Sequence, residues 1–183
     1  MDIKFIEEIR DNISNKKIKS YCNKVLKKLN FKSSNDMQNL AMLAEHLYIF
    51  GFYEEVLAIA DIVKSVEFTG DYTLWGEIEG IRAIEIRILR EQNWNIEADN
   101  VLKTLVPYFD PSLYENQKKA FSIYDRNILA SLENGSKQGA ISWQLIKLGL
   151  MIQYYETPDF PIDKETLNED IVKLKSELQT KIK

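Results

Sequence analysis

Apolar residues recur along most of this chain at the spacing of an amphipathic α-helix. In residues 18–29 they stand at i, i+3, i+4, i+7, i+8 and i+11, with lysines on the opposite side. The same period continues to a closing, charge-rich helix over about residues 163–182. No segment alternates at a period of two between turn signals. The pattern therefore predicts an all-α, single-domain protein over residues 1–183, an array of antiparallel helical hairpins with about nine helices.

The helix expected over residues 72–92 carries apolar side chains over an arc of about 200°. Gly76 and Gly80 lie one turn apart on its other side. Glycine inside a helix costs about 1 kcal/mol relative to alanine, so this pair predicts a second helix packed closely against it. Contacts on both sides would make this the central helix of the fold.

Three charged residues, Glu77, Arg82 and Glu85, fall inside the apolar arc of this helix. Arg82 and Glu85 are spaced i and i+3, which brings their side chains onto the same face. Two interpretations follow. The two residues form a buried ion pair, or they line a groove that a partner enters.

The hairpin expected over residues 36–65 resembles a tetratricopeptide (TPR) repeat at Leu40, Leu43, Ala44, Gly51, Tyr53 and Val56. The consensus prefers glycine at Ala44 and alanine at Val56. The resemblance implies two antiparallel helices joined by a turn at Gly51 in the left-handed conformation. A second, looser copy places Leu89, Asn93 and Ala98 at comparable offsets. No regular period of about 34 residues extends beyond it, so we expect a TPR-like hairpin protein rather than a regular solenoid.

The net charge of −4 is unevenly distributed. Residues 12–35 carry seven lysines and no acid, whereas residues 45–99 carry twelve acids and four bases. A surface rich in acids favours a basic partner. The lysine-rich segment contains no arginine and only Tyr21 and Phe31 as aromatic residues, so a solvated helix face is favoured over nucleic-acid binding.

Motifs for chemistry are missing from the sequence, which contains no glycine-rich nucleotide loop, no nucleophile elbow and no Cys-x-x-Cys pair. The single histidine, His46, has no second ligand at metal spacing and is expected to be a structural or surface residue. The single cysteine, Cys22, lies on an apolar helix face and is expected in the core. We therefore predict no catalytic residue, no metal and no cofactor.

The sequence also suggests where the protein works. No apolar run approaches the ~20 residues of a membrane span, and the N-terminal stretch lacks the features of a secretory signal. With one cysteine, no intramolecular disulfide can form, which fits a reducing cytoplasm. The Lys-, Asn- and Ile-rich composition is typical of AT-rich bacterial genomes.

In size, charge and architecture the chain is similar to small bacterial immunity proteins, which are encoded beside secreted toxins. That resemblance implies a non-catalytic protein that neutralises a toxin, often a nuclease, through an acidic surface. A TPR-like adaptor or regulatory protein and a helical enzyme using carboxylates remain alternatives. A deep polar pocket with perturbed carboxylates would favour the enzyme. The candidate partner-binding residues are Glu54, Glu77, Arg82, Glu85, Glu91 and Glu97, and the surface is expected to expose Glu54, Glu91 and Glu97.

Overall fold

The computed structural model describes residues 4–109 and 112–182, without the side chains of residues 112–118 and 120. Within these ranges the regular structure is helical and contains no strand, which confirms the all-α prediction. The helices are α1 (Lys4–Asn12), α2 (Lys16–Lys27), α3 (Ser34–Ile49), α4 (Tyr53–Val63), α5 (Tyr72–Glu91), α6 (Asn95–Leu105), a short 3-10 turn (Val106–Tyr108), α7 (Ser112–Glu133), α8 (Lys137–Glu156) and α9 (Lys164–Lys181). None of the described helices is both long and apolar enough to cross a membrane.

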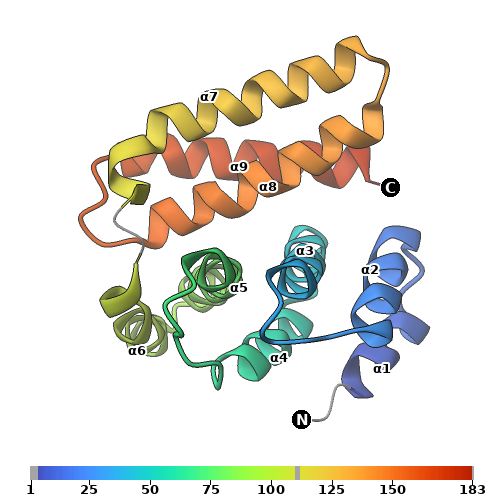
Figure 1. Ribbon diagram of the computed structural model, residues 1–183, viewed down its shortest axis with the longest axis horizontal. Helices are drawn as coiled ribbons and strands as arrows, with labels where there is room; N and C mark the ends of the chain where they lie inside the picture. The colour runs from blue at the N-terminus through green and yellow to red at the C-terminus, as the bar shows by residue number, and fades with distance from the viewer. Residues whose placement is uncertain (1–3, 110–111, 183) are drawn as a thin grey trace.

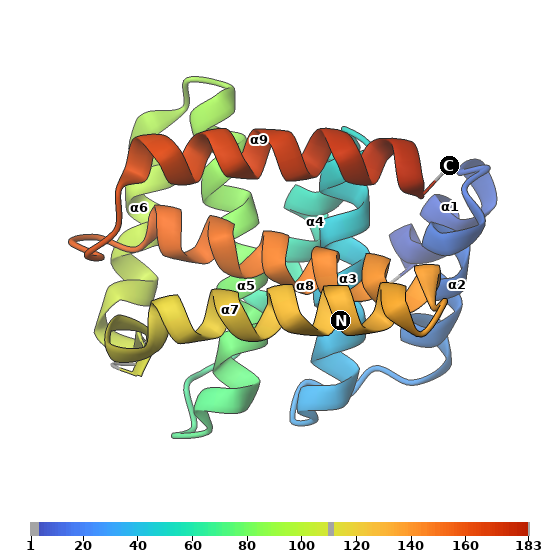
Figure 2. The ribbon, with the colours of Figure 1, turned by 90° about the horizontal axis from the view of Figure 1, so that it is seen from above.

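The helices form two layers (Figure 1). Helices α1 to α6 make one layer, and α7, α8 and α9 make the other. Figure 2 shows that α7–α9 run across α3–α6 rather than extending their array. Consecutive helices pack against each other within each layer, as the hairpin prediction requires, and α8 contacts α3 and α5 across the layers. The meeting of α3, α5 and α8 therefore joins the two halves of the chain.

Two hairpins of the first layer turn in the same way. Gly51, between α3 and α4, has φ +80°, which confirms the predicted left-handed turn. The amide of the next residue, Phe52, donates to the carbonyl oxygen of Leu47 at 2.9 Å. Asn93, between α5 and α6, has φ 63°, and the following amide donates to Leu89 O at 2.8 Å. Both helices end in a left-handed residue with the 6→1 bond that satisfies an otherwise unpaired carbonyl.

Helix α5 is central, as predicted, because it contacts α3, α4, α6 and α8. The interpretation of its glycines was wrong, however. A Cβ built on Gly76 or on Gly80 meets no atom within 4 Å outside its own helix. Among the described residues no side chain packs closely against these two glycines, which border an open cavity instead.

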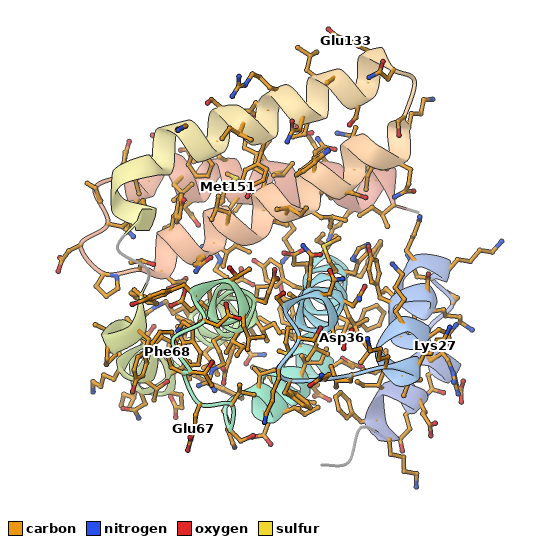
Figure 3. The ribbon with its side chains drawn as sticks, viewed as in Figure 1. Lys27, Asp36, Glu67, Phe68, Glu133 and Met151 are labelled. Atoms are coloured by element: carbon orange, nitrogen blue, oxygen red, sulfur yellow. The ribbon has the colours of Figure 1, made fainter. Side chains whose placement is uncertain are left out.

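Side chains fill the space between the layers and within each layer (Figure 3). In the loop before α5, Glu67 points away from the helices, whereas Phe68 points toward them. The Phe68 ring lies 5.5 Å from that of Trp75 on α5 and 5.0 Å from that of Tyr108 after α6. This aromatic cluster packs the loop against the end of the first layer.

Candidate functional site

An open cavity of about 280 Å³ lies where α3, α5 and α8 meet, with Tyr124 of α7 at its edge. Three of its wall residues are glycines. Gly76 and Gly80 of α5 leave open space, and Gly149 of α8 leaves room for the carboxyl group of Glu45. A Cβ on Gly149 would overlap Glu45 Oε1. The glycines of α5 therefore keep the cavity open, whereas the glycine of α8 accommodates a buried carboxyl group.

Three glutamates from two helices line this cavity: Glu45 from α3, and Glu77 and Glu79 from α5. Glu45 is only 8% exposed, and its Oε2 has no hydrogen-bond partner. Glu79 Oε2 accepts a hydrogen bond from Gln153 Nε2 of α8 at 2.8 Å. We call these three residues the glutamate cluster.

Burial changes the acidity of the glutamate cluster. Removal from water raises the pKa of Glu45 well above its ordinary value, and the nearby charge of Glu77 raises it further. Burial also raises the pKa of Glu77 to about 7. The hydroxyl of Tyr124 has a raised pKa, chiefly because of burial and then because of Glu77 and Glu45. These groups are close enough to influence one another.

Among the described residues that line the cavity, none is Lys, Arg or His. The described cavity wall therefore supplies no base to Glu45 and Glu77, and a positive group entering the cavity would favour their ionised forms. In the part of the chain that the structure describes, no group of three His, Cys, Asp or Glu side chains is placed to hold a metal ion.

Of the predicted site residues, Arg82 and Glu85 come together. Arg82 Nε lies 2.7 Å from Glu85 Oε2, and the side chains are 9% and 16% exposed, although the two atoms are not aligned for a hydrogen bond. The largely buried ion pair of the first interpretation is therefore formed. Arg82 also borders a separate cavity of about 400 Å³ next to Phe68 and Trp75, but Glu85 does not line it.

The remaining predicted acids, Glu54, Glu91 and Glu97, lie on α4, α5 and α6. Glu54 on α4 and Glu97 on α6 are exposed, as expected. Glu91 at the end of α5 is exposed as well, as expected, but its carboxylate is engaged within the protein. It accepts hydrogen bonds from Arg87 Nε, Tyr48 Oη and Tyr53 Oη, each at 2.9 Å.

The Glu91 network reaches α9 through Lys175. Its ammonium donates to Tyr53 Oη at 3.0 Å and lies 3.7 Å from the centre of the Tyr48 ring. Burial opposes ionisation of Glu91, but Lys175 and the three hydrogen bonds keep the pKa of this carboxyl below its ordinary value. The network links α3, α4, α5 and α9, so Glu91 holds the two layers together.

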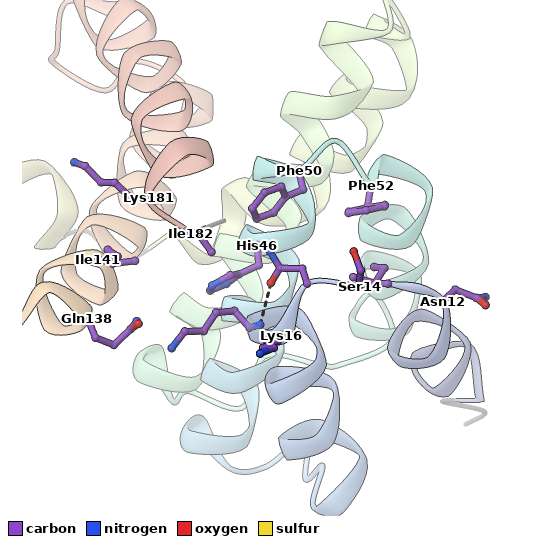
Figure 4. Close-up of a pocket in the computed structure, with 13 residues that line it drawn as sticks. Asn12, Ser14, Lys16, His46, Phe50, Phe52, Gln138, Ile141, Lys181 and Ile182 are labelled. Carbon is purple, nitrogen blue, oxygen red and sulfur yellow. Dashed lines mark hydrogen bonds between the residues drawn. The ribbon is translucent and has the colours of Figure 1, made fainter.

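A second cavity, of about 820 Å³, lies between the α1–α2 loop and the ends of α3 and α9 (Figure 4). It is bordered by Lys16, Lys17 and Lys181, and by His46, which is 2% exposed. Burial lowers the pKa of His46, and its Nδ1 lies 2.6 Å from Met42 O, so it is a neutral structural histidine as predicted. Lys181 is already held by Glu177 and Gln144. This basic cavity offers weaker grounds for a ligand than the glutamate cluster.

Sequence reasoning missed Glu45 and Glu79 as site residues. A signal for Glu45 was present, because residues 40–49 are apolar apart from Glu45, His46 and the hydroxyl of Tyr48, so a helix over this stretch has no polar face. An acid in such a stretch must either find a partner inside the protein or face a cavity. Glu79 gave a weaker signal, since it lies only two positions from Glu77 on a helix with several charges.

Comparison with known proteins identifies a family and no individual relative. Neither a curated protein nor a solved structure matches the chain. Residues 4–168, which include the whole glutamate cluster and its three glycines, match the model of DUF6707, a family of unknown function, and the chain belongs to that family.

Proposed function

We propose that this protein is a non-catalytic binding module that captures a basic partner protein. The observation that supports the proposal is the glutamate cluster, in which buried Glu45 has an unpartnered oxygen and the described cavity wall supplies no base. Leaving a buried carboxyl without a partner costs free energy. A cation from a partner would restore that interaction, so the cavity favours binding.

The acids of residues 45–99 supply a second part of the mechanism. Exposed Glu54 and Glu97 add negative charge to the surface at some distance from the cavity. Such charges speed the approach of a basic protein and lose their effect as salt increases. Neutralisation of a secreted toxin, as by a bacterial immunity protein, is the role we propose for this binding. A TPR-like adaptor would use the same mode of recognition.

The reducing cytoplasm is the compartment we propose for this binding. Cys22 is fully buried, and burial raises the pKa of its thiol to about 11. A thiol with this pKa remains protonated and inert at neutral pH. Cys22 is therefore a core residue that needs no disulfide partner.

The test compares proteins captured from the native host by three tagged forms of the chain. These are the wild type, the double variant Glu45→Gln/Glu77→Gln, and the control Glu54→Gln, which changes one exposed acid outside the cavity. Mass spectrometry should identify a basic protein held by the wild type and the control and lost from the double variant. The same captured proteins in all three samples, or no basic protein in any, would contradict the proposal.

A helical enzyme using carboxylates is a second candidate, favoured by the pKa of about 7 at Glu77. A carboxyl group that titrates near neutrality can both donate and accept a proton. The two candidates differ in what happens to the bound partner. An unchanged partner mass after prolonged incubation favours binding alone, whereas a mass change that Glu77→Gln abolishes would identify an enzyme.

A further inference from the structure

We infer that the glutamate cluster binds a single alkylammonium group, supplied as one lysine side chain of the partner. This inference rests on the proposed function, because it assigns the ligand of the same site. Glu45 lines the cavity, only 8% of it is exposed, and its buried Oε2 has no hydrogen-bond partner. Glu77 lies near enough to raise its pKa through charge repulsion. An ammonium carries three N–H donors on a compact point charge, which suits carboxylates converging from different helices.

The size of the cavity limits the ligand to one side chain. Its volume of about 280 Å³ lies at the lower limit of the roughly 300–1,000 Å³ typical of small-molecule sites. It corresponds to roughly nine water molecules at about 30 Å³ each. A lysine side chain fits such a space, whereas a folded segment of a partner does not.

The wall of the cavity also matches the aliphatic part of lysine. Beside the glutamates it contains the apolar side chains of Ala41, Met42, Ile146 and Leu150. The open faces of Gly76 and Gly80 add backbone with no side chain projecting into the space. Lysine commonly places its methylene groups along apolar surface while its charge reaches a polar partner.

The charged surroundings of Glu45 contain no competing cation among the described residues of the cavity wall. Its titratable neighbours are Glu77 and Glu79 of α5, Tyr124 of α7 and Tyr72 at the start of α5. Tyr21 of α2 also lies close enough to interact electrostatically with Glu45. None of these groups is a base, so an entering ammonium meets no opposing positive charge from the described wall and is attracted by the glutamates of α3 and α5.

The experiment uses the seven glycines of the chain as reporters in an amide NMR titration. Gly76, Gly80 and Gly149 line the cavity, and the other four do not. The probe is lysine blocked at both ends as Nα-acetyl-lysine-N-methylamide, and its Nε-acetylated form is the uncharged control. We expect saturable shifts at the three cavity glycines with the charged probe alone. No shift at these glycines, or equal shifts with the acetylated form, would overturn the inference.

Two variants and one control locate the binding. Glu45→Gln prevents ionisation at this position with little change in shape and should weaken binding at least tenfold, as expected for a lost charge-assisted hydrogen bond. Gly80→Leu fills the cavity without altering its charge and should abolish the shifts. Glu54→Gln should bind as the wild type does. Wild-type affinity in both Glu45→Gln and Gly80→Leu would place the probe elsewhere and overturn the inference.

A parallel titration with putrescine distinguishes two possible ligands of the cavity, a lysine side chain of a partner protein and a free amine. Binding of putrescine without binding of the blocked lysine would overturn the assignment to a partner's lysine. A captured basic partner together with no probe binding would refute the inference and leave the proposed function standing. Probe binding that depends on Glu45, with no partner captured from the host, would refute the proposed function and leave the ammonium site standing.

Discussion

Adding one methyl group at two glycines that border the cavity should change stability in opposite directions. Gly80 lies inside α5 in ordinary helical conformation, and a Cβ there meets nothing within 4 Å. Gly80→Ala should therefore keep the full gain in helix propensity, about 0.8–1.0 kcal/mol. For a domain of this length that gain raises the melting temperature by about 2–4 °C.

Gly149→Ala should gain the same propensity and lose more through crowding. The added Cβ would overlap Glu45 Oε1 and lie 3.3 Å from Glu45 Cδ. The carboxyl group must move, and it is held in a buried position between α3 and α8. Overpacking of this kind costs about 1–3 kcal/mol, so the net result is a loss of about 1 kcal/mol.

Urea unfolding followed by circular dichroism measures both effects. The double variant Glu45→Ala/Gly149→Ala removes the obstructing carboxyl group and should show a favourable coupling of about 1–2 kcal/mol relative to the sum of the single variants. A lower urea midpoint for Gly80→Ala would mean that another element packs on this face of α5. Equal stabilisation by Gly149→Ala and Gly80→Ala would mean that Glu45 does not lie against α8.

Other parts of the structure give four further predictions. Gly51→Val should destabilise the protein by about 1–2 kcal/mol in urea unfolding, because φ is +80° there and a β-branched residue is strained at positive φ. Glu91→Gln should lower stability by about 1–2 kcal/mol in the same assay, since it weakens three hydrogen bonds to one carboxylate. Burial raises the pKa of Glu77 from its ordinary value of 4.5 to about 7, so the folded state binds more protons than the unfolded state between these pH values. Stability should therefore fall as pH rises through this range, and thermal melts of Glu77→Gln should show a shallower fall. Glu54→Lys/Glu97→Lys should slow association with a basic partner in surface plasmon resonance, most strongly at low salt, with little change in melting temperature.

Local features of the fold could be predicted because local chemistry decides them. The helix expected over residues 72–92 is observed as α5 (Tyr72–Glu91), and the closing helix expected over about 163–182 is α9 (Lys164–Lys181). The turn at Gly51 followed from the ability of glycine to adopt positive φ. Each prediction depended on the residues of one segment and its immediate neighbours.

The layer arrangement could not be predicted from the same signals. Periodicity identifies an apolar face but does not say which distant helix covers it. The pair Gly76 and Gly80 shows the consequence. Two small residues one turn apart are compatible with a closely packed neighbour and equally with an open cavity. The choice depends on where α8 lies, and α8 begins at Lys137, far along the chain.

The excess of acidic residues over basic residues in 45–99 likewise did not show which carboxylates could bind a partner. Glu85 pairs with Arg82, and Glu91 accepts three hydrogen bonds, so the charge of both is already engaged within the protein. The linear charge count treated them as equivalent to exposed Glu54. A carboxylate becomes a candidate for binding only when the fold leaves it without a compensating base.

Several features that each reduce the stability of the protein occur together at the glutamate cluster. Gly76 and Gly80 each lower the propensity of α5 to be helical, yet both lie beside the cavity and leave it open. Gly149 lowers the helix propensity of α8 and accommodates the buried carboxyl group of Glu45, whose Oε2 has no hydrogen-bond partner. Any one of these features has an ordinary structural explanation. Their occurrence around one cavity, on three helices far apart in sequence, is expected when stability is sacrificed to maintain a binding site.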